Sequence, residues 1–279
     1  MAAPKVIALY RTDRGRFALD ETGEWQPSIK STIVVGRTGD APVAYLCGVL
    51  NSELLDLWYA VRGKTPWHVR RNYEPLRMNE MPYRRPDGDP RADEVATLVR
   101  EIAANRRALL PHRAVVSDLG RTLKDPWKTG PVEVDRAALV RELPKQELVS
   151  VRVDPSLEVG GKPAGRPRRE APDALAFRRG RDETGRIVGD PARIDLLEKI
   201  VGGRAVDDVS ALLLPRDLDA FERRAEDRGH EVGELLREGR ERVERVERLV
   251  CALYGLTDEL TAAVVEHAVK RAGGSGPSD

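Results

Sequence analysis

The stretch from Ala44 to Gly63, AYLCGVLNSELLDLWYAVRG, constrains the fold of this chain most strongly. Its apolar residues recur every three or four positions, which places them on one face of a helix about five turns long. Gly63 can adopt the left-handed backbone conformation that ends a helix, so the stop signal agrees with the spacing. The apolar positions are Leu46, Val49, Leu50, Leu54, Leu57, Trp58 and Val61.

Three short runs before this helix predict strands. Residues 31–36 (STIVVG) are rich in β-branched side chains, and residues 4–9 (PKVIAL) are largely apolar. Residues 16–23 (RFALDETG) indicate a strand that enters a turn at Asp20 and Gly23. A mixture of short strands with one long helix predicts a small α+β unit.

These pieces, taken in order, resemble a known family. A TIVV strand, a helix of the form YLxGxLNSxLLxxWY, a basic aromatic segment and a closing MPY are similar to the C-terminal specificity domain of TaqI-like DNA adenine methyltransferases. That family includes the fused type IIG restriction–modification enzymes. The strand at 16–23 and the stretch LVCALYGLT at 249–257 agree with the same pattern. The resemblance covers roughly residues 4–110 and 235–268.

The resemblance implies a target-recognition domain that binds duplex DNA and positions a methyltransferase. Methyltransferases of this group need a glycine-rich loop for S-adenosylmethionine and an (N/D/S)PP(Y/F) element for the flipped adenine. We find neither motif, because Asp125-Pro126-Trp127 has one proline where the element has two. We therefore expect no cofactor in this chain, S-adenosylmethionine on a catalytic methyltransferase partner, and double-stranded DNA as the ligand. A separate specificity subunit and the remnant of a split gene both remain open, as does an enzymatic role.

Residues 64–91 contain the first set of candidate DNA contacts. Seven positive and four negative side chains give a balance of 7 − 4 = +3, and aromatic residues are interleaved with them. Arginine and lysine bind phosphates, arginine reads guanine, and aromatic rings pack on sugars and bases. The alternative is a solvated arginine-rich loop whose aromatic residues fill the core. The candidate contacts are Lys64, Trp67, His68, Arg70, Arg71, Tyr73, Arg77, Arg84 and Arg85.

Residues 154–186 contain the second set. Proline, glycine and arginine dominate, and between Lys162 and Arg186 the charge balance is 8 − 4 = +4. We interpret this segment as a basic loop that closes over DNA, with a hairpin formed by residues 174–177 and 186–188. A disordered surface insertion is the alternative. The candidate contacts here are Arg166, Arg168, Arg169, Arg178 and Arg179.

Two helices with narrow apolar stripes predict an antiparallel, coiled-coil-like spacer. Over residues 232–254 the stripe steps by 4, 3, 4, 3, 4 and 3, which is a heptad seam with arginine and glutamate between. Residues 92–110 show similar spacing and end before Pro111. The alternative function is a structural protein that assembles through the 232–254 helix. The seam residues are Val232, Leu236, Gly239, Val243, Val246, Val250 and Leu253.

The remaining chain completes the predicted α+β architecture. Shorter helices are expected near 135–142, 191–201 and 216–225, a strand at 147–153, and a last helix capped by Thr257 with Leu260, Val264 and Val265 inward. The predicted domains are 1–90 (target recognition), 91–112 (spacer helix), 113–231 (second α+β part), 232–271 (C-terminal helices) and 272–279 (flexible tail).

Composition excludes several classes of protein. The net charge is +1, so any affinity for DNA must arise from local patches. Cys47 and Cys251 lie in apolar helical patterns and are expected to be buried, reduced thiols. The four histidines have no metal-ligand spacing, and nuclease motifs are missing. Without a signal peptide or a long apolar run, we expect a cytoplasmic protein that makes no membrane contact.

Overall fold

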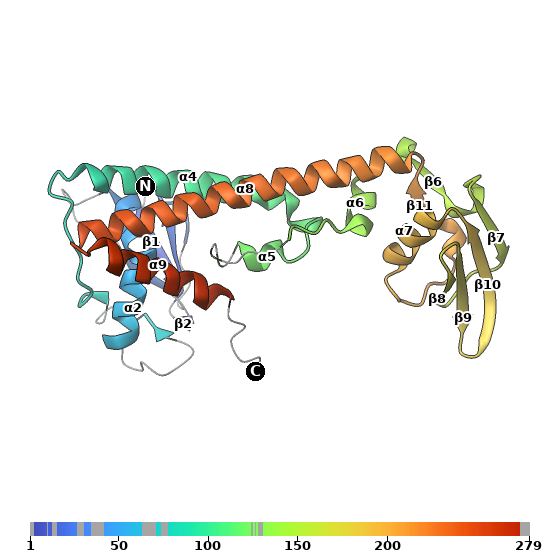
Figure 1. The fold of residues 1–279 in the computed structure, drawn as a ribbon, viewed down its shortest axis with the longest axis horizontal. Helices are drawn as coiled ribbons and strands as arrows, with labels where there is room; N and C mark the ends of the chain where they lie inside the picture. The colour runs from blue at the N-terminus through green and yellow to red at the C-terminus, as the bar shows by residue number, and fades with distance from the viewer. Residues whose placement is uncertain are drawn as a thin grey trace. The chain divides into compact units, whose positions relative to one another are not determined.

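The structure, a computed structural model, describes residues 3–9, 11–12, 16–26, 31–34, 42–62, 71–73, 78–123, 125, 127 and 131–273 (Figure 1). The chain divides into two compact units. Unit 1 consists of Met1–Leu110, Arg121–Gly130 and Glu234–Asp279, and unit 2 consists of Pro111–Gly120 and Pro131–Gly233. The N-terminal strands and the C-terminal helices therefore belong to the same unit, although they lie at opposite ends of the sequence.

Unit 1 is built on a three-stranded antiparallel sheet in the order β3-β1-β4. The central strand β1 (Lys5–Leu9) pairs with β3 (Phe17–Asp20) on one side and with β4 (Ser31–Val34) on the other. The three strands predicted from the sequence are thus confirmed, β1 and β3 with shorter bounds, while residues 35–36 of the third lie outside the described residues. A separate two-residue ladder joins β2 (Arg11–Thr12) to β5 (Arg71–Asn72).

The helix predicted over residues 44–62 is two helices, α1 (Val43–Asn51) and α2 (Glu53–Arg62). The prediction of a single helix is wrong at Ser52, whose backbone is extended (φ −68°, ψ 147°). The Ser52 hydroxyl donates to the carbonyl oxygen of Val49 (2.7 Å), which satisfies one of the acceptors left over at the end of α1. Spacing cannot reveal this break, because the apolar positions keep the same period on both sides of it.

Glu247, on the C-terminal half of α8 (Leu218–Leu253), explains why the second helix begins at once. Its buried carboxylate accepts hydrogen bonds from the backbone N–H groups of Glu53 (2.8 Å) and Leu54 (3.1 Å) at the start of α2. These are donors without intrahelical partners, and a negative charge is favourable at that end of a helix dipole. The heptad pattern placed Glu247 among the exposed positions, and its contact with α2 accounts for the difference.

Within unit 1, α4 (Pro90–Leu109) packs antiparallel to the second half of α8 (Leu218–Leu253) (Figure 1). The contacts show the direction, because residue numbers fall along α8 as they rise along α4. The predicted antiparallel packing is therefore confirmed. Contacting pairs are Glu94–Arg245 (2.8 Å), Glu101–Arg242 (3.1 Å) and Asn105–Leu235 (2.9 Å).

α8 is one helix where the sequence predicted two, over 216–225 and 232–254. The sequence left residues 226–231 between the two predicted helices, and one of them is Gly229, a residue type that costs about 1 kcal/mol in a helix interior. In the structure Gly229 faces the side chain of Val134, and packing of this kind stabilises a helix through a weak residue.

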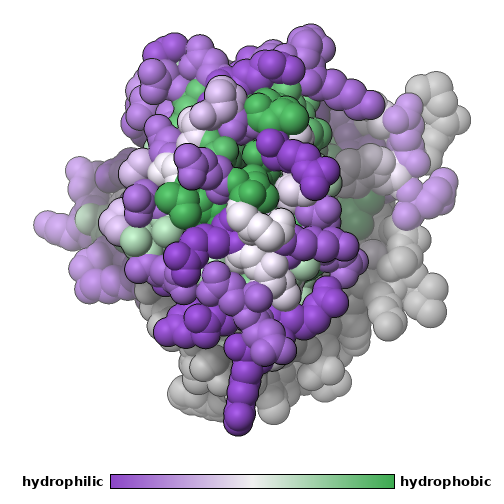
Figure 2. All heavy atoms as spheres, turned by 90° about the vertical axis from the view of Figure 1, so that its right-hand side faces the viewer, coloured by the Kyte–Doolittle hydropathy of each residue, from purple (hydrophilic) through white to green (hydrophobic). Residues whose placement is uncertain are grey.

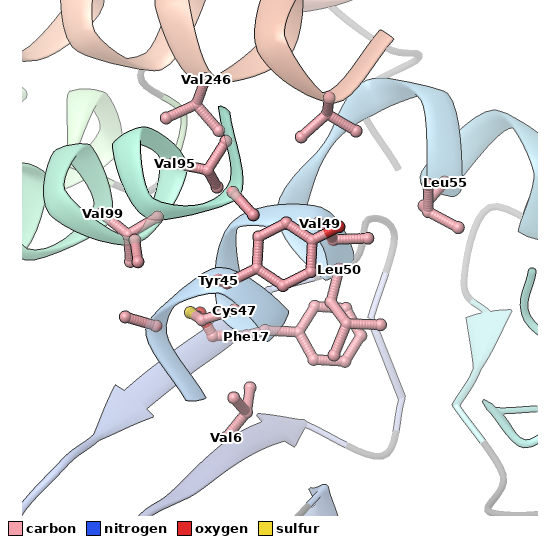
Figure 3. Packing of buried hydrophobic residues seen from close by; sticks show 14 of the residues in the cluster. Val6, Phe17, Tyr45, Cys47, Val49, Leu50, Leu55, Val95, Val99 and Val246 are labelled. Carbon is pink, nitrogen blue, oxygen red and sulfur yellow. The ribbon is translucent and has the colours of Figure 1, made fainter. Parts of the chain in front are cut away.

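The core of unit 1 lies between the sheet, α1, α4 and α8 (Figure 3). Gly48 is the point where α1 approaches α4 most closely: a Cβ atom there would lie 2.6 Å from Val95 and 2.9 Å from Val99. Cys47 and Cys251 are buried free thiols, as predicted, and burial raises the pKa of each to about 12. Both thiols are therefore protonated and unreactive at neutral pH.

The C-terminal helix α9 (Asp258–Gly273) begins after a glycine stop. Gly255 has φ +75°, and the N–H of Leu256 reaches back five residues to a carbonyl of α8, as in a Schellman motif. The predicted cap is confirmed, because the Thr257 hydroxyl accepts from the N–H of Leu260 (3.3 Å). The inward position predicted for Leu260 is wrong, since its side chain is 56% exposed. Buried positions of this helix are Thr261, Val264, Val265, Ala268 and Ala272.

Unit 2 contains a four-stranded antiparallel sheet in the order β7-β10-β9-β8, so the prediction of a basic loop over 154–186 is wrong. The hairpin expected within it is confirmed, because residues 186–188 pair with residues 176–174. The strands are β7 (Leu157–Gly161), β8 (Arg166–Ala171), β9 (Ala174–Arg179) and β10 (Asp182–Gly189).

Glycine explains why this sheet was missed. At Gly165, with φ +102°, a Cβ atom would lie 2.2 Å from the carbonyl oxygen of Arg178. At Gly185, inside β10, a Cβ atom would lie 2.6 Å from the backbone nitrogen of Pro163. Glycines that suggested a loop are thus positions where two backbones approach each other, which is a recognised use of glycine in strands.

Helix α7 (Pro191–Val201) contacts β9 and β10 and covers one face of this sheet. It has the predicted bounds, with Asp190 accepting from the first backbone N–H groups and Gly202 (φ +60°) after its last residue. The predicted strand at 147–153 is confirmed only as β6 (Leu148–Ser150), which pairs with β11 (Leu213–Pro215).

The remaining elements are short. They are the helices α5 (Leu119–Thr122) and α6 (Arg136–Glu142) and the 3-10 turns Leu110–Ala114, Lys145–Glu147, Val151–Val153 and Val209–Ala211. The mixture of small antiparallel sheets with long packed helices confirms the α+β class. Among the described residues, no helix combines the length and the apolar character needed to cross a membrane.

Candidate nucleic-acid interface

Part of the first set of candidate contacts lies outside the described residues. These positions are Lys64, Trp67, His68, Arg70 and Arg77. Arg71 is described only through the backbone of β5. Their proposed contacts with DNA stay predictions.

Tyr73 belongs to the core rather than to a DNA-binding surface. Its side chain is 1% exposed, its ring stacks on Tyr59 with centroids 4.6 Å apart, and it meets Phe17 edge-on at 5.5 Å. Its hydroxyl donates to a carboxylate oxygen of Asp56 (3.0 Å). The prediction that Tyr73 shapes the DNA surface is wrong, and the alternative of an aromatic residue that fills the core holds at this position.

Arg84 and Arg85 are exposed, in the segment that leads to α4. The following Asp87-Gly88 turn has φ +42° and +78°, and Asp89 caps α4 by accepting from the N–H of Arg91 (3.0 Å). Residues 84–91 line an open hollow of about 630 Å³. The acidic residues Asp87 and Asp89 thus form a turn and a helix cap, and the two arginines face solvent beside them.

In unit 2 the side chains of β8 alternate between the two faces of the sheet. Pro167 and Arg169 are half-buried and pair with the buried residues Phe177 and Leu175. The side chains of Arg166 and Arg168 lie on the opposite face and are exposed. In Figure 2, which looks at unit 2, hydrophilic residues surround a smaller apolar group. We call the solvent face of β8, β9 and β10 the arginine face; its charged residues are Arg166, Arg168, Glu170, Arg178, Glu183 and Arg186.

Arg169 is a structural residue and not an available DNA contact. Its guanidinium donates to the carbonyl oxygens of Ala171 (2.9 Å) and Pro172 (2.6 Å) and to the carboxylate of Glu198 on α7 (3.1 Å). It therefore fixes the turn after β8 to the helix that covers the other face. The prediction that Arg169 binds DNA is corrected accordingly.

Part of the arginine face carries its own counter-charges. Glu170 lies 2.7 Å from Arg186 and 3.7 Å from Arg178, and Glu183 lies 3.4 Å from Arg186. Arg178 is half-buried, so it lies at the edge of what a ligand can reach. Arg186 was counted in the charge balance of the sequence but was not among the candidate contacts. Its position beside Glu170 follows from the register of the strands, which the sequence does not reveal.

Four exposed arginines on this sheet and in its last turn have no carboxylate within ion-pair distance among the described residues. Two stand on the edge strand β8, one ends β9, and one lies in the turn between β9 and β10. Their backbones are close together, because Arg166 pairs with Arg178, the residue before Arg179. The four are Arg166, Arg168, Arg179 and Arg181. Arg181 was not among the candidate contacts, although it was counted in the local excess of positive charge.

The described residues contain no group of three or more His, Cys, Asp or Glu side chains able to hold a metal ion. Comparison of the chain with protein-family models, with curated proteins and with solved structures finds no match. The function is therefore argued from the exposed arginines of the unit 2 sheet, whose strand β8 is an edge strand.

Proposed function

We propose that the chain is the DNA-recognition module of an adenine-methyltransferase or restriction–modification system. It binds duplex DNA and positions a catalytic methyltransferase that another chain supplies. The observation that carries the proposal is the group of four exposed arginines on β8, at the end of β9 and in the β9–β10 turn, which have no acidic partner among the described residues. The link to adenine methyltransferases comes from the order of the motifs in unit 1.

The geometry of β8 suits a phosphate backbone. Arg166 and Arg168 are two positions apart on one face, so their Cα atoms are roughly 7 Å apart along an extended strand. Guanidinium groups bind phosphate oxygens in a bidentate manner, and the side chains start from a fixed ladder rather than from a free loop. Pro167 and the charges beside it also discourage pairing of this edge strand with another chain, which leaves the edge open for a ligand.

The small number of candidate arginines predicts a moderate dependence of binding on salt. Each phosphate neutralised by a cationic side chain contributes about −0.9 to the slope of log K against log salt. Four arginines that each bind one phosphate would therefore give a slope of about −4. A much steeper slope would require cationic residues beyond this group.

The rival function, assembly through the 232–254 helix, has less support. Its seam residues Val246, Val250 and Leu253 are buried in the core of unit 1 with residues of α1 and α4. A seam that already packs within its own chain is not available to a second copy.

The test is selection from a pool of random duplexes at about 0.05 M and about 0.2 M salt, followed by sequencing of the retained DNA. We expect one short motif to be enriched at both concentrations. The double variant Arg166→Ala, Arg168→Ala should lower affinity and make the salt slope shallower by about 2. A matched control is Arg141→Ala, Arg223→Ala, which removes two exposed arginines elsewhere in unit 2.

The outcomes separate the possibilities. Equal loss of affinity in the control and the test variant would mean that binding is a diffuse charge effect and would contradict the proposed interface. Retention without enrichment would contradict sequence recognition by this chain. No retention at either salt concentration would remove DNA as the ligand.

A further inference from the structure

We infer that unit 1 carries a second phosphate-binding element, the loop of residues 82–86, and that Tyr45 and Tyr254 position it. The inference rests on the proposed function, because it names another contact of the same protein with nucleic acid. Its ligand is the phosphate backbone of duplex DNA, and its cationic groups are Arg84 and Arg85.

Two tyrosine hydroxyls hold the backbone of this loop. The Tyr45 hydroxyl, from α1, donates to the carbonyl oxygen of Arg84 (2.9 Å). The Tyr254 hydroxyl, just after α8, donates to the carbonyl oxygen of Pro82 (2.5 Å) and accepts from the N–H of Arg84 (3.2 Å). Both peptide groups of Arg84 are therefore fixed by side chains that come from distant parts of the sequence.

The tyrosines are themselves fixed. Tyr45 is fully buried in the core of unit 1, and its ring meets that of Tyr83 edge-on with centroids 6.2 Å apart (Figure 3 shows Tyr45). Burial raises the pKa of Tyr45 and of Tyr254 above the ordinary value for a phenol. Both hydroxyls consequently keep their protons at neutral pH and remain donors to the loop.

The guanidinium groups of the loop remain available. Arg84 and Arg85 are exposed, and neither has a carboxylate within ion-pair distance among the residues the structure describes. Asp89 binds Arg91 (2.5 Å), and that hydrogen bond is the main cause that lowers the pKa of Asp89 to about 2, with a smaller contribution from the charge of Arg84. Asp87 is exposed in the turn itself.

A loop held in this way has little conformational entropy to lose when it binds. Preorganisation of this kind raises affinity without adding contacts. The phenols and the arginines therefore have separable effects: removal of a guanidinium removes a phosphate contact, whereas removal of a phenol hydroxyl leaves the contact but loosens the backbone that presents it.

The experiment measures binding of a labelled random-sequence duplex between about 0.05 M and about 0.2 M salt. We expect Arg84→Ala, Arg85→Ala to make the salt slope shallower by about 2, whereas Arg84→Lys, Arg85→Lys should keep it. The matched control is Arg62→Ala, Arg107→Ala, two exposed arginines of the same unit. The control should leave the slope unchanged.

The positioning role is tested by Tyr254→Phe, which keeps the ring and removes both hydrogen bonds. Affinity should fall by a factor of roughly two to ten, the range that hydrogen bonds of ordinary strength cover, with an unchanged salt slope. In the Arg84→Ala, Arg85→Ala background the same substitution should have no further effect, because the loop no longer carries a contact. Tyr45→Phe should behave in the same way.

The possible failures are distinguishable. Equal losses from Tyr254→Phe in both backgrounds would show that the tyrosine acts through general stability and would overturn the positioning role. An unchanged slope in Arg84→Ala, Arg85→Ala, together with a reduced slope in Arg166→Ala, Arg168→Ala, would overturn the inference and leave the proposed function in place. No binding by the unmodified chain would overturn both.

Discussion

The second half of α8 and the sheet of unit 2 are both dense in arginine, yet their arginines differ in their partners. On α8 each of four arginines binds a glutamate of its own helix or of α4. On the sheet Arg178 and Arg186 have carboxylate partners, whereas four other exposed arginines have none among the described residues. The paired set is Arg237, Arg242, Arg245 and Arg248, and the open set is Arg166, Arg168, Arg179 and Arg181.

The difference teaches that the density of arginine in a sequence is a poor guide to a binding surface. A helix with glutamate and arginine three or four positions apart neutralises its own charge, because those positions are neighbours on its surface. On an antiparallel sheet the neighbours come from other strands, so the pairing depends on register. Only the arginines that the register leaves without acids are available to a phosphate.

A third group of charges, in unit 1, is paired in the protein interior. Arg271 of α9 lies 2.6 Å from Glu53 and 2.6 Å from Asp56, two carboxylates of α2 that are almost fully buried. His267 lies 2.9 Å from Glu53. These contacts attach the C-terminal helix to α2, and they are the charges whose removal should matter most to stability.

The largest expected effect on stability is therefore that of Arg271→Ala. The substitution leaves two buried carboxylates with one cationic partner fewer, and breaking a buried pair of this kind costs about 3 kcal/mol. Urea unfolding monitored by the tryptophan fluorescence of unit 1 measures the change. The control Lys270→Ala breaks an exposed pair with Glu266 (2.5 Å) on the same helix and should cost less than about 0.5 kcal/mol. Similar costs for the two variants would contradict the distinction between buried and exposed pairing.

Glu247→Ala should come next. The variant removes the acceptor of two backbone N–H groups at the start of α2, and loss of a helix cap costs about 1–2 kcal/mol. Glu244→Ala, three residues earlier on α8, removes only an exposed partner of Arg248 (2.7 Å) and serves as the matched control. Thermal unfolding of both variants compares them; an unchanged midpoint for Glu247→Ala would refute its role as the cap of α2.

The buried pair of Lys5 and Asp20 predicts a dependence on pH that appears only in acid. The Lys5 ammonium, 2.7 Å from the Asp20 carboxylate, is the main cause that lowers the pKa of Asp20 to about 2, with a further contribution from the N–H of Trp25. A lowered pKa means that the ionised group stabilises the fold above the unfolded pKa of about 4 and that this stabilisation is lost as the pH falls through the folded value. Urea midpoints measured between about pH 4 and about pH 2 should therefore fall. The decline should be weaker in Asp20→Asn; an equal decline would assign it to other groups.

The smallest effects on stability should come from the open arginines. Arg166→Ala, Arg168→Ala breaks no ion pair among the described residues, so the free energy of unfolding should change by less than about 0.5 kcal/mol. The change in DNA affinity predicted for the same variant then separates function from folding. A large loss of stability would show that these side chains hold the sheet together, which would place them with the structural charges.

Local signals in the sequence determined much of the secondary structure. The three strands of unit 1, the bounds of α7 and the Thr257 cap of α9 were all predicted from residues next to one another. Such features depend on backbone conformations and hydrogen bonds within a few residues, so they can be recognised without knowledge of the fold. The antiparallel pairing of α4 with α8 followed from their matching apolar stripes.

Only the tertiary structure determines which of the predicted surface side chains are exposed to a ligand and which are buried or held in contacts. Tyr73 became a core residue by stacking on Tyr59, and Arg169 became a structural residue by reaching α7. Glu247 became buried because α2 begins against it. Each outcome depends on a partner far away in the sequence.

The sheet of unit 2 shows the same limit for a whole element. From the sequence alone, its glycines suggested a loop. In the sheet, Gly165 and Gly185 lie where a second backbone is so close that a Cβ atom would clash with it. The composition therefore showed an excess of arginine between residues 154 and 186. The register of the strands determines which of those arginines pair with a carboxylate and which are exposed to solvent. The physical reason is that the charge of a side chain follows from its residue type, whereas its availability to a ligand depends on whether another residue pairs with it.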